Sequence, residues 1–284
     1  MMFSVILFTA VALGQQDAEK TPEAQPKSAS PDAAKAIQGF KADAAAYDMR
    51  LRDRPDEMLT LREEPLLHWG NPERNGEDGA AFVWMLDGRP EVIGGVFTFR
   101  RGGFIHRKHQ YHSLAAGPLT AEFRGERVWA PKSAGVTFRP IPEAPQPAAT
   151  SRQRLTQMKN LARDFSAQLV DNNDQLQELR LVTQPLIRYE PKDKRIVDGG
   201  LFAFVVGTDP EAILLLEAQT ENEHTAWKFA MARYHFADLT ASYQGRKVWH
   251  AEKLPGMGGL DLGELMYQDS VYASYRVSIT QAAA

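Results

Sequence analysis

The residues of this chain best suited to chemistry are three histidines, spaced three apart in the segment FIHRKHQYH that begins at Phe104. Imidazole binds metals and transfers protons near neutral pH. If the segment is a β-strand, its period of two places His106 and His112 on one face, about 20 Å apart, and His109 on the other. One ion could not then bind all three. The sequence therefore predicts an exposed basic strand, with no metal or cofactor.

Positive charge gathers beside these histidines. The cations of this region are Arg100, Arg101, Arg107 and Lys108. Such a strip favours an anionic ligand, for example a carboxylated glycan or a phosphate group. The candidate ligand-binding residues are Arg107, Tyr111 and His112. The sequence offers no candidate catalytic residue.

The elements that position these residues belong to a sequence that repeats after 120 residues. DGAAFVWMLDGRPEVI from Asp78 matches DGGLFAFVVGTDPEAI from Asp198, and two further blocks match at the same spacing. The three blocks are identical at 14 of 32 positions. This indicates an internal duplication.

Residues kept in both copies are expected to serve the fold, since one active site needs only one set. Asp78 and Asp198 are interpreted as turn formers. Glu91 and Glu211 are expected to be solvated beside hairpin turns, and Gly125 and Gly245 to supply positive φ. Trp129 and Trp249 are interpreted as core aromatics. The residues of each of these four pairs are 120 positions apart.

The chain is expected to divide into four parts. Residues 1–14 are apolar and end in Ala-Leu-Gly, as a signal peptide does, and residues 15–31 form a polar, disordered tether. Repeat unit one spans residues 32–145. Repeat unit two spans residues 146–284 and contains an inserted loop at 254–270.

Each unit is expected to begin with one amphipathic helix, over residues 32 to about 52 and 151 to about 170. Five or six antiparallel strands follow, with a hairpin at Asp87-Gly88. The sequence therefore predicts an α+β fold of two tandem repeats with a cystatin-like or NTF2-like element order.

Composition excludes several classes of site. The chain has no cysteine, which rules out disulfides, thiolate nucleophiles and Cys-based metal sites. Its net charge of −3 provides no global attraction for nucleic acid. After residues 1–14, no stretch is apolar enough for a transmembrane segment.

Several phrases resemble an uncharacterised family of exported proteins from planctomycete-type bacteria. They are HSLAAGPLTAEFRGERVWAP, GVTFRPIPEAPQPAAT, RLTQMKNLARDFSA, TQPLIRYE and LFAFVVGTDPEAILLLEA. The resemblance covers roughly residues 60–250 and implies export and this two-unit layout. It implies no activity, ligand or catalytic residue.

We therefore expect an exported, periplasmic or extracellular protein that binds or scaffolds without catalysis, with an envelope protein or a small anionic ligand as partner. The alternative is a small-molecule-binding protein, or an enzyme of hydrolase or isomerase type, with a pocket in one cone-shaped sheet.

Overall fold

Within the residues that the structure describes, the protein is mostly β, with 56% in strands and 11% in helices. The structure is a computed structural model that describes residues 31–71, 77–171, 173–254 and 268–282. The expected signal peptide, nearly all of the expected tether and most of the expected inserted loop lie outside these residues.

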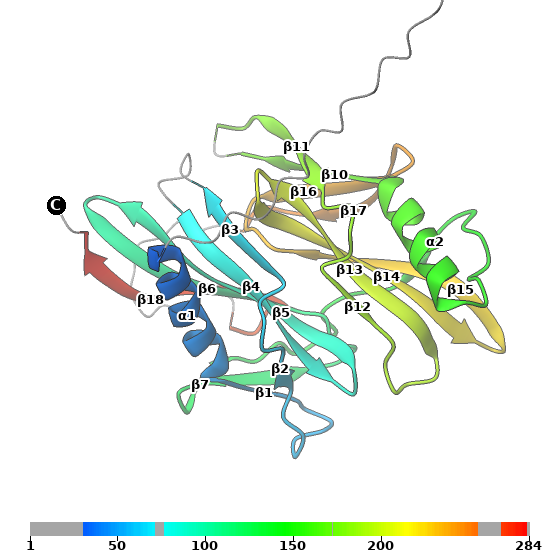
Figure 1. Cartoon of the computed structure of the whole chain (residues 1–284), viewed down its shortest axis with the longest axis horizontal. Coiled ribbons are helices and arrows are strands. Elements are labelled where there is room, and N and C mark those ends of the chain that lie inside the picture. The colour runs from blue at the N-terminus through cyan, green and yellow to red at the C-terminus, as the bar shows by residue number, and fades with distance from the viewer. Residues whose placement is uncertain (1–30, 72–76, 172, 255–267, 283–284) are drawn as a thin grey trace, which may run out of the picture.

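The first half of the chain begins with helix α1 (Pro31–Ala45), which lies across one face of a sheet (Figure 1). Nine strands follow it in the described residues. They are β1 (Tyr47–Leu51), β2 (Thr60–Leu61), β3 (Leu67–Asn71), β4 (Glu77–Leu86), β5 (Arg89–Arg101), β6 (Phe104–Ser113), β7 (Leu119–Phe123), β8 (Glu126–Trp129) and β9 (Arg139–Pro140).

The second half begins with helix α2 (Ser151–Arg163), where the side chain of Thr150 caps the first turn by accepting from the Gln153 amide. The strands described after it are β10 (Phe165–Val170), β11 (Leu176–Leu181), β12 (Ile187–Tyr189), β13 (Ile196–Val206), β14 (Asp209–Glu221), β15 (His224–Arg233), β16 (Asp238–Tyr243), β17 (Arg246–Ala251) and β18 (Tyr272–Gln281).

The described strands form three antiparallel sheets. A three-stranded sheet has the order β1-β7-β8. A six-stranded sheet has the order β18-β6-β5-β4-β2, with β3 also paired to β4. A nine-stranded sheet has the order β17-β16-β10-β11-β13-β14-β15-β9, with β12 also paired to β13.

Two strands cross between the halves. Strand β18, from the end of the chain, pairs with β6 from Tyr272 opposite His112 to Gln281 opposite Phe104. Strand β9, from the first half, pairs with β15 at Arg139 and Pro140. Each of the two large sheets is therefore completed by a strand from the other half.

Three apolar clusters hold the layers together. One lies between the six-stranded sheet and the layer formed by α1 with the small sheet. A second lies between α2 with β10 and β16 and the face of β13–β15. The third joins the two large sheets to each other. Central strands are consequently buried on both faces, as in β14, whose first ten residues are all buried.

The predicted fold class is wrong. The structure does not consist of α+β units with one sheet each: it has three curled, largely antiparallel sheets, and its two described helices are short. A 15-residue or 13-residue helix covers only part of a sheet face, so β-strands cover the rest. The predicted cystatin-like or NTF2-like element order is therefore wrong as well. The internal duplication stays a prediction.

Both helix predictions extended too far. The expected helices ran to about residues 52 and 170, but strands begin at Tyr47 and Phe165. Phe165, Ala167 and Leu169 are buried alternately with more exposed neighbours, which is the strand period. These segments also contain apolar residues at helical spacing, and for this reason the predicted helices were too long.

The interpretation of the shared acidic residues is also wrong. Asp198 lies within β13, is fully buried, and accepts from Nε of Arg154 and Nε of Arg188, each at 2.8 Å. It therefore joins α2 to the nine-stranded sheet. Asp78 also lies within a strand, β4, and its Oδ1 is 2.9 Å from Nε2 of His68.

Glu91 and Glu211 are buried rather than solvated, at 7% and 0% exposure. Glu91 shares the guanidinium of Arg89 with Glu217, at 3.1 and 3.2 Å, and the hydroxyl of Tyr189 donates to Glu217 at 2.8 Å. This cluster connects β5 to β12 and β14, across the two halves. Burial raises the pKa of Glu91 to about 7, although Arg89 lowers it.

Some local predictions are confirmed. Asp87 and Gly88 both have positive φ, as a tight hairpin turn requires, and they connect β4 to β5. Gly125 and Gly245 have φ of 84° and 77°.

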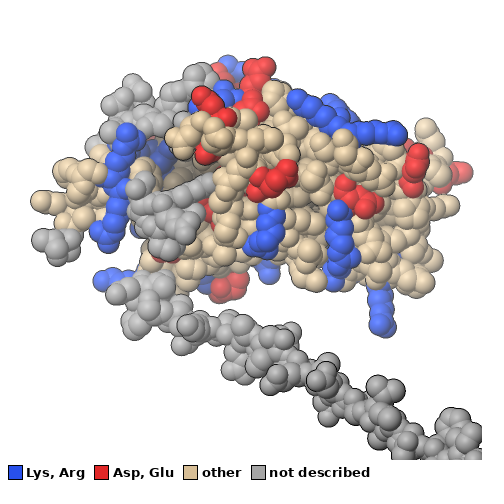
Figure 2. Space-filling view, turned by 90° about the horizontal axis from the view of Figure 1, so that it is seen from above, with Lys and Arg blue, Asp and Glu red and all other residues tan. Residues whose placement is uncertain are grey.

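On the face shown in Figure 2, basic and acidic side chains are interspersed. Within the described ranges, no helix is both long and apolar enough to cross a membrane.

Candidate ligand-binding cleft

The segment that sequence analysis singled out is a strand, β6, but it is not exposed. It lies between β5 and β18, and His106, His109 and His112 are at most 4% exposed. The prediction of an exposed basic strand is therefore wrong. It failed because β18, which covers the edge of β6, lies more than 150 residues further along the chain.

The structure does not bring the three candidate residues together. Tyr111 is 1% exposed and belongs to the apolar cluster between the six-stranded sheet and the layer that contains α1. Burial raises the pKa of its hydroxyl well above 10. Nε of Arg107 lies 2.6 Å from Asp43, and its guanidinium lies over the ring of Phe40. Both residues serve the fold. Only His112 reaches a cleft.

A buried polar network occupies the core of the first half. His109 is fully buried, with Nε2 3.0 Å from Asp43 and Nδ1 2.6 Å from the hydroxyl of Tyr47, which in turn contacts the hydroxyl of Tyr275. Burial lowers the pKa of His109 despite the neighbouring carboxylate. The order carboxylate, imidazole, hydroxyl suits proton transfer. However, each of these four residues is at most 7% exposed, so a substrate has no access to the network.

An open cleft of about 560 Å³ lies in the second half. Its walls are β15 and β17, the crossing segment 135–139, and residues 270–272, which precede and begin β18. Since β17 is one end of the nine-stranded sheet and β15 lies next to its other end, the cleft separates two margins of one curled sheet. This volume is in the range of small-molecule sites.

The cleft exists because β15 lacks a full partner. Strand β6 pairs with β18 over nine register positions, whereas β15 pairs with β9 at only two. Upstream of β9 the chain leaves β15 and runs toward the end of β6, where the Gly135 amide donates to the Ala115 carbonyl. Gly135 lies so close to Ser113 that a Cβ would overlap the Ser113 carbonyl, so this path requires glycine.

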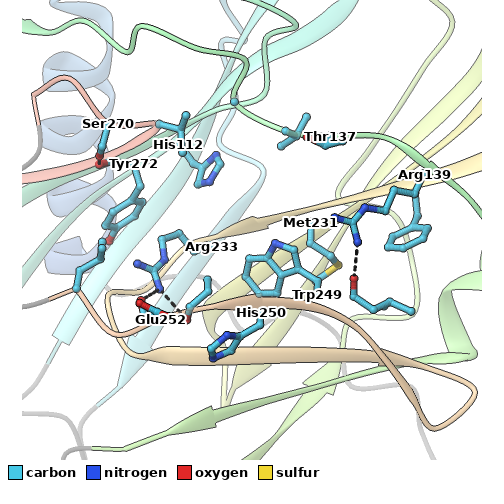
Figure 3. A pocket seen from close by; sticks show the side chains of 17 residues that line it. His112, Thr137, Arg139, Met231, Arg233, Trp249, His250, Glu252, Ser270 and Tyr272 are labelled. Carbon is cyan, nitrogen blue, oxygen red and sulfur yellow. Dashed lines mark hydrogen bonds between the residues drawn. The ribbon is translucent and has the colours of Figure 1, made fainter.

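The interior of the cleft is apolar and aromatic. Phe229 and Met231 are buried residues of β15 that belong to the second-half core and reach the cleft. Trp249 is only partly buried and lies beside Met231 (Figure 3). Trp129, 120 residues earlier, is 1% exposed and donates from Nε1 to the Ser270 carbonyl. The prediction that both tryptophans are core residues is confirmed for Trp129, whereas Trp249 is only partly buried and packs against the second-half core.

Two arginines lie in the cleft walls. Arg139 is exposed, and its Nη1 donates to the Val248 carbonyl at 3.2 Å, which connects β9 to β17. Arg233 is 6% exposed, and its Nη2 donates to the Ala237, Ala251 and Glu252 carbonyls (Figure 3). Glu252 is the carboxylate among the described lining residues. The cleft therefore has an excess of positive charge.

His112 lines the same cleft from the first half (Figure 3). Its ring is 4% exposed, and Nδ1 lies 2.8 Å from the Ser113 carbonyl. Burial is the main cause that lowers the pKa of His112, to about 4, and Arg233 lowers it further. The imidazole is therefore neutral at physiological pH.

The described side chains offer no group of three or more histidine, aspartate or glutamate residues arranged to hold a metal ion. His250, at the edge of the cleft, is 3.0 Å from Asp238. The cleft thus presents an aromatic interior, two guanidinium groups and one neutral imidazole. This combination can bind and orient an organic anion, but it contains no activated nucleophile among these residues.

Sequence analysis found one of the four residues that define the cleft. It identified His112 but missed Arg139, Arg233 and Trp249. Arg139 and Arg233 fall on different halves, and no local motif connects them. For Trp249 a signal was present, since the strands around it repeat but the chain after it differs between the copies.

Comparison of the chain with protein-family models, curated proteins and solved structures finds no match. The resemblance to exported proteins of planctomycete-type bacteria therefore stays a prediction from the sequence phrases.

Proposed function

We propose that this protein binds a small organic anion with an aromatic or aliphatic body, without catalysing its conversion. The observation that carries the proposal is the cleft of about 560 Å³ in which Trp249, Arg139, Arg233 and His112 converge from both halves of the chain. Its apolar interior suits the body of such a ligand, and its cations suit a carboxylate. An exported location, expected from residues 1–31, belongs to the same proposal.

Arg139 and Trp249 have separate roles in this proposal. The exposed guanidinium of Arg139 attracts the carboxylate, while its bond to the Val248 carbonyl holds the side chain across the opening. The partly buried indole of Trp249 supplies a flat apolar surface, and such rings contribute large contact area at low entropic cost. Arg233 contributes positive charge and fixes the end of β15 against β17.

The test is calorimetric titration of the purified full chain with 3-phenylpropionate and with its uncharged methyl ester. We expect the acid to bind at least about tenfold more tightly, because a hydrogen bond to a charged group contributes about 1.5 kcal/mol or more. Replacing Arg139→Gln should remove most of this preference. The matched control is Arg127→Gln on β8, which is also exposed but outside the cleft.

The Trp249→Ala variant should weaken binding of the acid about tenfold, which corresponds to about 1.4 kcal/mol. Phe104→Ala removes another exposed aromatic ring, 44% exposed on β6 and outside the cleft, and should leave Kd unchanged. Equal affinity for acid and ester, or an unchanged Kd in Trp249→Ala, would contradict the proposed function.

A further inference from the structure

The hydrogen-bond partner of His112 decides which of its two ring nitrogens carries the hydrogen. Nδ1 lies 2.8 Å from the Ser113 carbonyl oxygen, and a carbonyl oxygen only accepts. Nδ1 therefore carries the hydrogen. In the neutral ring, Nε2 then has a lone pair and acts only as an acceptor.

The surroundings of the ring keep it in this form. A second proton would create a cation on a residue that is 4% exposed and whose neighbour Arg233 is already positive. The ring of Tyr272 lies beside it, with centroids 6.3 Å apart, and its hydroxyl donates to Gln110 at 3.0 Å. The hydroxyl hydrogen of Tyr272 is thus donated to Gln110 and not to His112.

Nε2 of His112 has no hydrogen-bond partner in the described part of the chain. The Ser113 carbonyl is the one hydrogen-bond partner that the described residues give to this ring. The ring nonetheless forms part of the cleft wall and points toward the space between Arg233 and Thr137 (Figure 3). A nearly buried acceptor thus faces the place where a ligand would lie.

We propose that the cleft selects organic anions that carry an O–H or N–H donor at the position facing Nε2 of His112. This inference rests on the proposed function and specifies its ligand class, for example hydroxy acids rather than plain carboxylic acids. A ligand without the donor would displace water from Nε2 and leave a buried acceptor unpaired. That loss weakens binding by about tenfold or more.

The first measurement uses the unmodified full chain. Calorimetric Kd values are compared for 3-phenylpropionate and for its monohydroxy derivatives at carbon 2 and at the meta and para ring positions. These probes share the carboxylate and the ring and differ in where the donor lies. We expect at least one hydroxy acid to bind about tenfold or more tightly than 3-phenylpropionate.

The second measurement places that preference on His112. His112→Phe keeps a flat ring but removes Nε2, so the affinity ratio between the preferred hydroxy acid and 3-phenylpropionate should fall about tenfold, to near one. His112→Gln retains a side-chain oxygen that can accept, and it should restore part of the preference. Circular dichroism spectra and urea unfolding of each variant, compared with the wild type, show that it has folded.

A third measurement needs no variant at the site. In protein labelled with ¹⁵N-histidine, the Nε2 resonance of His112 should shift when the preferred hydroxy acid binds, and shift less with 3-phenylpropionate.

The outcomes separate the two proposals. If the acids bind but no hydroxy derivative is preferred, or if His112→Phe leaves the preference intact, the donor requirement is overturned and the anion-binding function stands. If no acid binds, both are overturned.

Discussion

At the scale of single residues, the same position in the two halves can have opposite surroundings. Asp78 and Asp198 are 120 residues apart, and both lie near the start of a long strand. The side chain of Asp78 is 30% exposed beside one histidine, whereas Asp198 is fully buried between two arginines. Removing one partner from a buried ion pair is far more costly than removing one from an exposed pair.

We therefore predict that Asp198→Ala lowers the free energy of unfolding by about 3–5 kcal/mol, since it leaves Arg154 and Arg188 without their shared carboxylate. Asp78→Ala is the matched control and should lower it by no more than about 1 kcal/mol. Urea unfolding followed by circular dichroism measures both. Equal losses in the two variants would show that Asp198 does not hold α2 to the sheet.

At the scale of elements, the crossing strands decide which sheet edge is closed. Strand β18 covers β6 along its whole length, while β9 covers only a short part of β15. The cleft is the remainder of that uncovered edge. The topology thus makes a candidate binding site in one half and a closed core in the other.

The crossing of β18 can be tested by a disulfide, because the chain has no cysteine of its own. Ile105 and Thr280 lie opposite each other on β6 and β18, so Ile105→Cys with Thr280→Cys should form an intramolecular disulfide in high yield under mild oxidation. Ile105→Cys with Ile279→Cys is the control, since neighbouring strand residues point to opposite faces. Non-reducing electrophoresis and mass spectrometry give the result.

A disulfide that joins two chains, or equal yield in both pairs, would contradict the pairing of β18 with β6 of the same chain.

At the scale of the whole molecule, stability should depend on the buried histidines. The pKa of His112 is about 4 in the folded protein and about 6.5 in an unfolded chain. As pH falls below about 6.5, the unfolded state takes up the proton first and is favoured. The stability contributed by neutral His112 is therefore fully present above pH 6.5 and is lost as pH falls to about 4.

We predict that this loss amounts to about 3 kcal/mol for His112. The measurement is the free energy of unfolding of the wild type and of His112→Gln at pH 7 and at pH 4. The difference between the two proteins should change by that amount across the interval, with the wild type losing more.

Replacing His224→Gln provides the control, because His224 is exposed at the start of β15 and should leave the pH profile unchanged. A difference between wild type and His112→Gln that stays constant with pH would contradict the assignment of His112 as a buried neutral ring.

The sequence by itself determined the features that depend on near neighbours. Turn residues located the Asp87-Gly88 hairpin, and the histidine segment was expected to be a strand, as it is. Alternation is absent where both faces of a strand are buried, as in β14, and apolar spacing could not separate helix from strand at Tyr47 and Phe165.

Only the tertiary structure decided which strands lie side by side, and therefore where the cleft is. A strand edge accepts any suitable partner, so the pairing of β18 with β6 and the short pairing of β9 with β15 depend on how distant segments pack. Those pairings bury His109, bring His112 to a cleft formed mainly by the other half, and leave Trp249 partly exposed. The sequence contains these residues, but their surroundings come from pairings between strands more than 80 residues apart.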